Sequence, residues 1–248
     1  MQVYELYNGT QHQWRIFGRD PDKPEGIIDT NQILVTSGER AMLVEPGGIE
    51  LFSPMLRAVL EYVEVEAIQD LFASHQDPDI VSSLGLWDNV LPQATLHAPW
   101  MWEGFIRHFG CEHITYNGIP DEGATIRLGR LELEAIPAHY LHSSGNFQLL
   151  DRQAGILMSG DVGMAIEPGQ EGAGFFCEDF DSHTQYMAPL HQRWMPSSEA
   201  VREWVDRVAE LDIRMLVPQH GRILYGEDVP RFLEWFRGLE VGRVRSHT

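Results

Sequence analysis

The sequence predicts a mixed α/β (α+β) fold in which two packed sheets are flanked by helices. Strand-like apolar runs form an early and a late group, and each group is mixed with helical patterns, whereas a single doubly wound sheet would alternate strands and helices throughout. The 248 residues suffice for one large domain with a sizeable core, so we expect a single domain over residues 1–248. A content of 43% hydrophobic and 22% charged residues is ordinary for a globular protein.

The first half of the chain supplies the early group of strands. Strands are predicted over residues 3–6, 14–17, 33–36, 41–45 and 67–73. A Pro46-Gly47-Gly48 turn precedes a helical pattern over about residues 52–63. A further helix is expected after Pro78, because proline is tolerated in a first helical turn. Residues 95–110 indicate a short strand and a helix.

The second half of the chain shows a similar mixture of strand and helix patterns. Strands are predicted over residues 130–137, 147–150, 156–159 and 213–217, and a closing helix over 228–239. Residues 198–211 form an amphipathic helical pattern with one apolar face, which consists of Val201, Trp204, Val205, Val208 and Leu211. Residues 166–196 show little periodicity, and a segment of that length is usually functional, such as a lid or a partner surface, or else flexible.

Composition excludes several classes of function. The formal net charge of −19 argues against binding a nucleic-acid backbone, which needs a basic surface. There is no apolar run of roughly 18 or more residues, so a membrane span is not expected. The N-terminus lacks the basic and apolar regions of a signal peptide. Cys111 and Cys177 are too few for a disulfide framework, and we expect reduced thiols in a cytoplasmic protein.

Three histidines and three aspartates fall where a two-metal site would need them. Each follows an apolar, strand-like run, where loops collect at the edge of a sheet. They are His75, Asp77, Asp79, His142, Asp161 and His220. Any one of them alone is more often a hydrogen-bonding residue, but together they indicate a site. Imidazole and carboxylate suit iron, zinc or manganese, and this mix favours non-haem iron, while zinc also fits.

The spacing predicts how two ions would share these residues. Alternate side chains of the 75–79 loop can converge on one point. We expect the first ion to bind His75, Asp77, His142 and Asp161, and the second to bind Asp79, Asp161 and His220. Asp161 would then bridge the ions. The second ion keeps more room for water or a diatomic molecule, and open positions are what a reactive metal requires.

These residues also carry a family resemblance over most of the chain. The chain resembles the metallo-β-lactamase-fold diiron domain of flavodiiron proteins, and especially the stand-alone oxygen-binding diiron proteins. The matching segments are His75-Gln76-Asp77-Pro78-Asp79, Leu141-His142-Ser143-Ser144-Gly145-Asn146-Phe147, Ser159-Gly160-Asp161-Val162-Gly163, Glu178-Asp179-Phe180-Asp181 and Pro218-Gln219-His220-Gly221. The resemblance implies a four-layer αββα sandwich and two iron ions at the six residues above.

The first motif departs from the family pattern at two positions. That pattern is His-x-Glu-x-Asp-His, so Asp77 matches the glutamate with a shorter arm and Ile80 stands where the final histidine is expected. Isoleucine cannot bind metal, so the second iron should have one protein ligand fewer. Hydrolytic members of the fold carry His-x-His-x-Asp-His. Asp77 in place of their second histidine favours iron over a zinc hydrolase.

Three further residues near these motifs are weighed. His139 is an alternative to His142 as the ligand. The family motif and the number of residues between this position and Asp161 favour His142. Tyr140 and Tyr186 could lie near the open coordination position and hydrogen-bond a bound ligand. Tyrosines of this kind more often simply pack with the hydroxyl group at the surface.

The resemblance implies redox chemistry with dioxygen or nitric oxide. Flavodiiron proteins draw electrons from a flavodoxin-like domain, and we expect neither that domain nor a flavin here. A redox or signalling protein partner is therefore expected, and the output could be sensing, dioxygen delivery or slow reduction. The resemblance also implies a homodimer. The alternative is a binuclear zinc hydrolase of a thioester or lactone, in which metal-bound water attacks a carbonyl.

Overall fold

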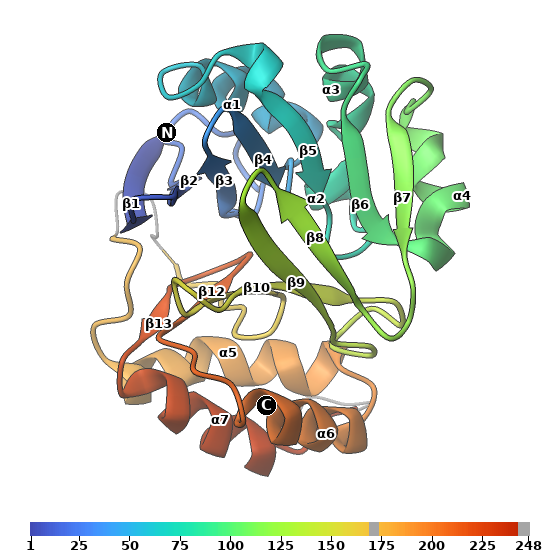
Figure 1. Ribbon diagram of the computed structural model, residues 1–248. Helices are drawn as coiled ribbons and strands as arrows, with labels where there is room; N and C mark the ends of the chain where they lie inside the picture. Colours follow the sequence, from blue (N-terminus) through green and yellow to red (C-terminus); the bar gives the residue numbers. More distant parts are fainter. Residues whose placement is uncertain (169–173, 243–248) are drawn as a thin grey trace.

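Two β-sheets pack face to face, and helices cover the outer surface of each (Figure 1). The computed structural model describes residues 1–168 and 174–242. The expected pair of sheets flanked by helices is confirmed. None of the helices within these residues has the length and apolarity that crossing a membrane requires. A single domain over residues 1–248 stays a prediction, because residues 169–173 and 243–248 lie outside the described residues.

The first sheet has seven strands in the order of the sequence. They are β1 (Gln2–Asn8), β2 (His12–Gly18), β3 (Gln32–Ser37), β4 (Arg40–Val44), β5 (Ile68–Phe72), β6 (Thr95–Pro99) and β7 (Thr115–Ile119). Strands β1 to β4 pair antiparallel, and β4 to β7 pair parallel. Its outer helices are α1 (Phe52–Val59), α2 (Pro78–Val81), α3 (Leu84–Val90) and α4 (Glu103–Ile106). Short 3-10 turns lie at Ile49–Leu51, Val65–Ala67, Trp100–Trp102 and Arg107–Phe109.

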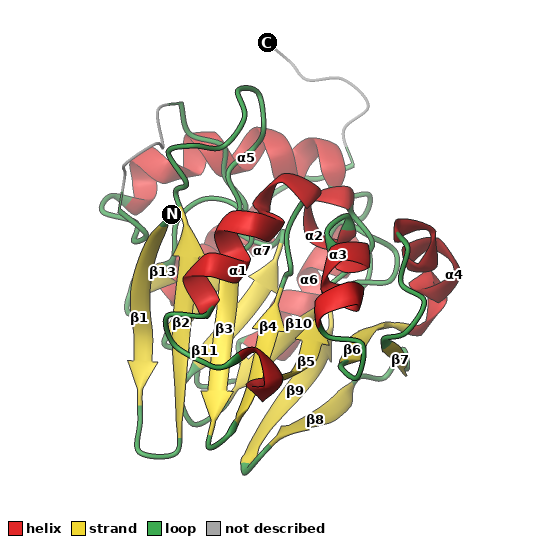
Figure 2. Ribbon diagram, turned by 90° about the horizontal axis from the view of Figure 1, so that it is seen from above, coloured by secondary structure: helices red, strands yellow, loops and turns green. Residues whose placement is uncertain are grey.

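The second sheet has six strands in the order β13-β12-β11-β10-β9-β8. They are β8 (Ala124–Leu128), β9 (Leu131–Pro137), β10 (Phe147–Asp151), β11 (Ile156–Gly160), β12 (Met215–Pro218) and β13 (Leu224–Tyr225). Only the β11–β12 pair is parallel. Helices α5 (Phe180–Trp194), α6 (Ser198–Val208) and α7 (Asp228–Gly238) cover its outer face. Figure 2 looks down on the sandwich, with α1, α2 and α3 in front of the strands.

The core lies between the sheets and under each helical layer. Side chains alternate along each strand, so one set faces the opposite sheet and the other faces the helices. Trp14, Phe72 and Phe147 belong to the cluster between the sheets, and all three are fully buried. Val201 and Trp204 of α6 pack beneath the second sheet, which confirms the apolar face expected for that helix. Cys111 and Cys177 are buried and unpaired.

The second half of residues 166–196 forms a helix that the sequence pattern did not predict. Helix α5 runs for 15 residues and begins at the N-cap Asp179, whose side chain accepts a hydrogen bond from the Ser182 amide. Its buried face consists of Phe180, His183, Met187 and His191, so half of that face is histidine. An apolar pattern cannot be recognised when polar residues occupy the buried positions. Pro189 inside the helix conceals it further. Residues 169–173 of this segment lie outside the described residues.

Three strands were not predicted from the sequence, and one helix is shorter than predicted. Strands β7, β8 and β13 were not expected, and β7 contains Asn117-Gly118, a pair typical of turns. The helix expected over residues 52–63 ends as α1 at Val59. These differences affect the outer parts of the sheets and leave the predicted site-bearing strands in place.

Candidate metal centre

All six predicted site residues lie at one edge of the sandwich. His75 and Asp77 follow β5, and Asp79 lies in the short helix α2. His142 lies in the loop between β9 and β10. Asp161 follows β11 and His220 follows β12, which pair in parallel and therefore end at the same edge. Parallel strands deliver the loops at their carboxyl ends to one place, so residues distant in sequence meet there.

Four of these residues form a compact cluster. His75, Asp77, His142 and Asp161 each offer a ligand atom within 4.8 Å of the others. Nε2 of His142 lies 2.7 Å from Asp161 Oδ2 and 3.3 Å from Asp77 Oδ2. Nε2 of His75 lies 3.2 Å from the same Asp161 oxygen. Two imidazole nitrogens and two carboxylates thus converge on one point, which is the arrangement expected for the first ion.

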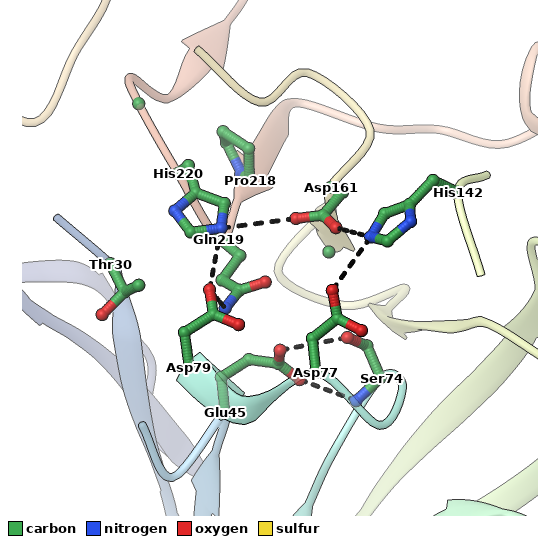
Figure 3. Close-up of polar contacts among 12 residues, drawn as sticks. Thr30, Glu45, Ser74, Asp77, Asp79, His142, Asp161, Pro218, Gln219 and His220 are labelled. Atoms are coloured by element: carbon green, nitrogen blue, oxygen red, sulfur yellow. Dashed lines mark hydrogen bonds and ion pairs between the residues drawn. The ribbon is translucent and has the colours of Figure 1, made fainter. Parts of the chain in front are cut away.

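The other oxygen of Asp161 faces a second group. Asp161 Oδ1 lies 3.6 Å from His220 Nε2, and that nitrogen lies 3.1 Å from Asp79 Oδ2 (Figure 3). Asp161 therefore stands between two donor sets and presents a separate oxygen to each. This is the placement that a carboxylate bridging two ions requires.

Several donor atoms at the cluster make no hydrogen bond within the described part of the chain. They are Nε2 of His75, Nε2 of His142 and Oδ1 of Asp161, and all three are buried. Buried polar atoms are almost always hydrogen-bonded, so three potential metal-ligating atoms without a hydrogen bond around one point call for another partner. A cation would satisfy them together. The residues present therefore fit a pair of metal ions, and mixed imidazole and carboxylate donors suit iron.

Opposite charges dominate the electrostatics of the cluster. Burial alone would lower the pKa of His142, but the carboxylates of Asp161 and Asp77 outweigh burial and raise it to about 9. Burial is likewise outweighed at His220, where Asp79 and Asp161 raise the pKa to about 9. Burial would raise the pKa of Asp161, yet the imidazole of His75 and its neighbours hold it well below the usual range. Protons on the histidines thus occupy the place that metal ions would take.

Metal uptake should therefore depend steeply on pH. Because His142 and His220 hold their protons up to a pH of about 9, and despite burial the carboxylate of Asp161 also raises the pKa of His75, loading both positions near neutral pH should release about three protons per chain. Apparent affinity should rise as pH increases toward 9 and fall as pH decreases, since protons compete for the same nitrogens. Titration with Zn²⁺ in weak buffer containing a pH indicator measures the release. His142→Ala should release fewer protons, and an affinity that is constant between neutral pH and pH 9 would contradict this prediction.

The buried Glu45 is linked to His75 through Ser74. Nδ1 of His75 lies 2.8 Å from the Ser74 hydroxyl group, which donates to Glu45 Oε2, and the Ser74 amide donates to Glu45 Oε1. Glu45 follows β4 with a φ of 55°, a conformation that few non-glycine residues adopt. Burial raises its pKa to about 7 despite the nearby His75. Outer partners of this kind fix the ring orientation of a ligating histidine.

The loop that carries His220 is clamped by buried side chains of the first sheet. Arg19 donates to the Gly221 carbonyl oxygen at 2.7 Å and to Asp29 at 2.5 Å. Asn31 donates to the carbonyl oxygens of Pro218 and Gly221. Gly221 has a φ of 90°, and a Cβ there would lie 2.9 Å from the Cβ of Ala165. Sequence analysis did not identify Glu45, Arg19 or Asn31, because no motif or spacing marks residues that act through other residues.

The structure places the competing candidates elsewhere. His139 does not join the cluster, and its Nε2 lies 3.0 Å from the carbonyl oxygen of Asp121. Tyr140 is 51% exposed. Tyr186 lines a separate pocket beside Cys177 and His183. A role for either tyrosine at the metals stays a prediction.

A pocket of about 340 Å³ opens directly onto the cluster. Asp77, Asp79, Asp161 and His220 line its floor. Ile27, Ile28 and Trp194 line its walls, and the Trp194 ring packs edge-on against His142 at 5.2 Å between centroids. Trp194 ends helix α5, so the segment that sequence analysis left unassigned contributes a wall of the site.

The comparisons with known proteins agree with this geometry. The model of an ODP family of β-lactamase domains matches residues 28–221. The structure of the peroxy diiron species of the chemotaxis sensor ODP is 34% identical, covers 98% of this chain and 97% of its own, and has a TM-score of 0.86. The apo state of the chemotaxis sensor ODP from T. denticola is also 34% identical, with 97% and 96% coverage and the same TM-score. No curated protein matches this sequence.

More distant structures share the fold. The flavodiiron protein from Giardia intestinalis has a TM-score of 0.80 at 15% identity, and the match covers 95% of this chain and 59% of that one. The expected metallo-β-lactamase-type sandwich is thereby confirmed.

Proposed function

This chain belongs to the ODP family of β-lactamase-fold proteins, and we propose that it is a non-haem diiron protein that binds dioxygen. The observation that carries the proposal is Asp161, which presents one oxygen to His75 and His142 and the other to His220. The 34% identical chemotaxis sensor ODP, whose structure was obtained as a peroxy diiron species, supports iron and dioxygen as the ligands.

The six residues would hold the two ions unequally. His75, Asp77, His142 and Asp161 would bind the first ion, and Asp79, Asp161 and His220 the second. Two ferrous ions would supply the electrons that dioxygen or nitric oxide accepts. Ile80 is fully buried in the apolar cluster beneath α1 and α3, so it adds no donor and leaves the second position more open.

Apolar side chains line part of the pocket over the site. Ile27 and Ile28 are partly exposed at its wall, and Trp194 is 41% exposed there. Apolar walls interact weakly with water and tolerate a neutral diatomic molecule. The chain's own contribution is thus to hold two cations, shield them with apolar side chains and leave a path for the ligand.

We propose sensing as the output, because the relative at 34% identity is described as a chemotaxis sensor. Delivery, or slow reduction of dioxygen or nitric oxide with electrons from a protein partner, is the alternative. A signalling or redox partner, a homodimer and a cytoplasmic location stay predictions. Zinc or manganese could replace iron at these donors.

Anaerobic iron analysis followed by absorption spectroscopy tests the proposal. We expect about two irons per chain, since the donors form two sets around Asp161. Admission of air should produce a visible band that disappears on degassing. Irreversible oxidation would instead indicate a reductase that depends on a partner. Zinc at the site, with no visible band and with hydrolysis of a thioester or lactone, would overturn the proposal in favour of the hydrolase.

A further inference from the structure

Gln219 places an unsatisfied amide at the second metal position. Its side chain is buried, with 1% of the residue exposed. The amide nitrogen donates to Asp79 Oδ2 at 3.0 Å, but Oε1 has no hydrogen-bond partner among the described residues. Figure 3 shows the amide group beside the carboxylate of Asp79 and under the imidazole of His220. A buried amide oxygen without a partner is unfavourable, so it needs a donor or a cation.

A second glutamine provides an internal comparison. Gln76 follows His75 directly and donates to Asp77 Oδ1 at 3.0 Å, much as Gln219 precedes His220 and donates to Asp79. The amide oxygen of Gln76, however, accepts a hydrogen bond from the Ser143 hydroxyl group at 2.8 Å. Of these two glutamines, only Gln219 has an amide oxygen without a partner among the described residues, and its amide nitrogen donates to Asp79 of the position with fewer donors.

The second position is short of donors without Gln219. It has one imidazole and two carboxylates, whereas the first has two of each. The buried Ile80 side chain cannot contribute. Asp161 Oδ1, the bridging atom on this side, also makes no hydrogen bond within the described residues. Two buried oxygens without a hydrogen bond thus belong to side chains beside Asp79 and His220, and both are oxygens that a hard or borderline cation accepts as ligands.

We propose that Gln219 is a ligand of the second metal ion, with its amide oxygen as a fourth protein donor beside Asp79, Asp161 and His220. This inference rests on the proposed diiron centre. The amide nitrogen meanwhile holds Asp79 in place. Because a neutral amide oxygen is a weaker donor than imidazole for iron, the second ion is held less tightly than the first, and the two positions fill in order.

The backbone of Gln219 allows the side chain to be tested alone. The backbone N–H of Gln219 donates to the Gly160 carbonyl oxygen at 2.8 Å, and the backbone carbonyl oxygen of Gln219 accepts from the Asn31 backbone N–H at 2.7 Å. These bonds do not involve the side chain, so the loop should keep its path when Gln219 is replaced by methionine, which has a similar length and no amide.

Anaerobic titration with Co²⁺ against a competing chelator tests the assignment through stoichiometry, affinity and visible absorption. The wild type should bind two Co²⁺ ions. Gln219→Met should weaken only the second, by more than the roughly 100-fold that loss of an outer partner costs, and alter its absorption band. Gln219→Glu, which keeps an oxygen but has no N–H, should restore both the affinity and the band. Gln76→Met is the matched control and should affect only the first ion.

The outcomes separate this inference from the proposed function. If the wild type fails to bind two ions, both the role of Gln219 and the proposed diiron function are overturned. If the wild type binds two ions and Gln219→Met leaves the second affinity unchanged, only the role of Gln219 is overturned. If Gln219→Glu is as weak as Gln219→Met, the amide acts solely by orienting Asp79 through its N–H, and the ligand assignment is also overturned.

Discussion

Replacement of Asp161 by alanine should abolish binding of both metal ions. One Asp161 oxygen faces His75 and His142, and the other faces His220, so a single truncation removes a donor from each position. Loss of a direct ligand should reduce affinity at both positions by more than the roughly 100-fold that loss of an outer partner costs. Metal analysis of the variant after desalting should therefore find almost no metal, whereas the wild type retains about two ions.

Two single-position variants serve as controls for this prediction. Asp79→Ala should lose only the second ion, because Asp79 contacts His220 and lies outside the compact cluster. His142→Ala should weaken the first ion most. Circular dichroism of the metal-free variants checks that each has folded. Retention of two ions by a folded Asp161→Ala variant would show that Asp161 is not a bridge.

Replacement of Arg19 by methionine should destabilise the protein by about 3 kcal/mol, since it leaves a partner of a buried ion pair without its countercharge. The Arg19 side chain is fully buried and joins Asp29, Asn31 and the Gly221 carbonyl oxygen. Methionine keeps much of the aliphatic packing, so the loss reflects the guanidinium group. Urea denaturation of the metal-free variant measures the change in the free energy of unfolding.

The same substitution should also weaken metal binding unequally. Within the described residues, the Arg19 hydrogen bonds join Asp29, Asn31 and the loop of His220 and none joins the His75 or His142 loop, so the second ion should be affected more than the first. Arg152→Met is the matched control, because Arg152 also makes a two-bond pair, with Glu134, but on the exposed surface. Exposed pairs contribute roughly 0–1 kcal/mol, so the control should stay close to the wild type. Equal losses for the two variants would contradict the clamp.

The site residues that follow a strand closely were predictable from local sequence patterns. Short apolar runs placed β5, β11 and β12 before His75, Asp161 and His220, and the edge of a sheet is where such residues meet. Helix α5 escaped prediction because His183 and His191 fill buried positions that an apolar pattern would reserve for hydrophobic residues. Trp194, which ends that helix, was missed for the same reason.

Residue types and their spacing were enough to predict imidazole and carboxylate donors, and the family resemblance added that Ile80 stands where a further donor is expected. These are properties of residue type and local order, which a single chain displays directly. The packed chain shows in addition which Asp161 oxygen faces which histidine, that Arg19 and Glu45, which directly follow β2 and β4, support the site, and that the Gln219 oxygen is unpaired. Such contacts join residues far apart in the chain, and their geometry exists only after the two sheets have packed together.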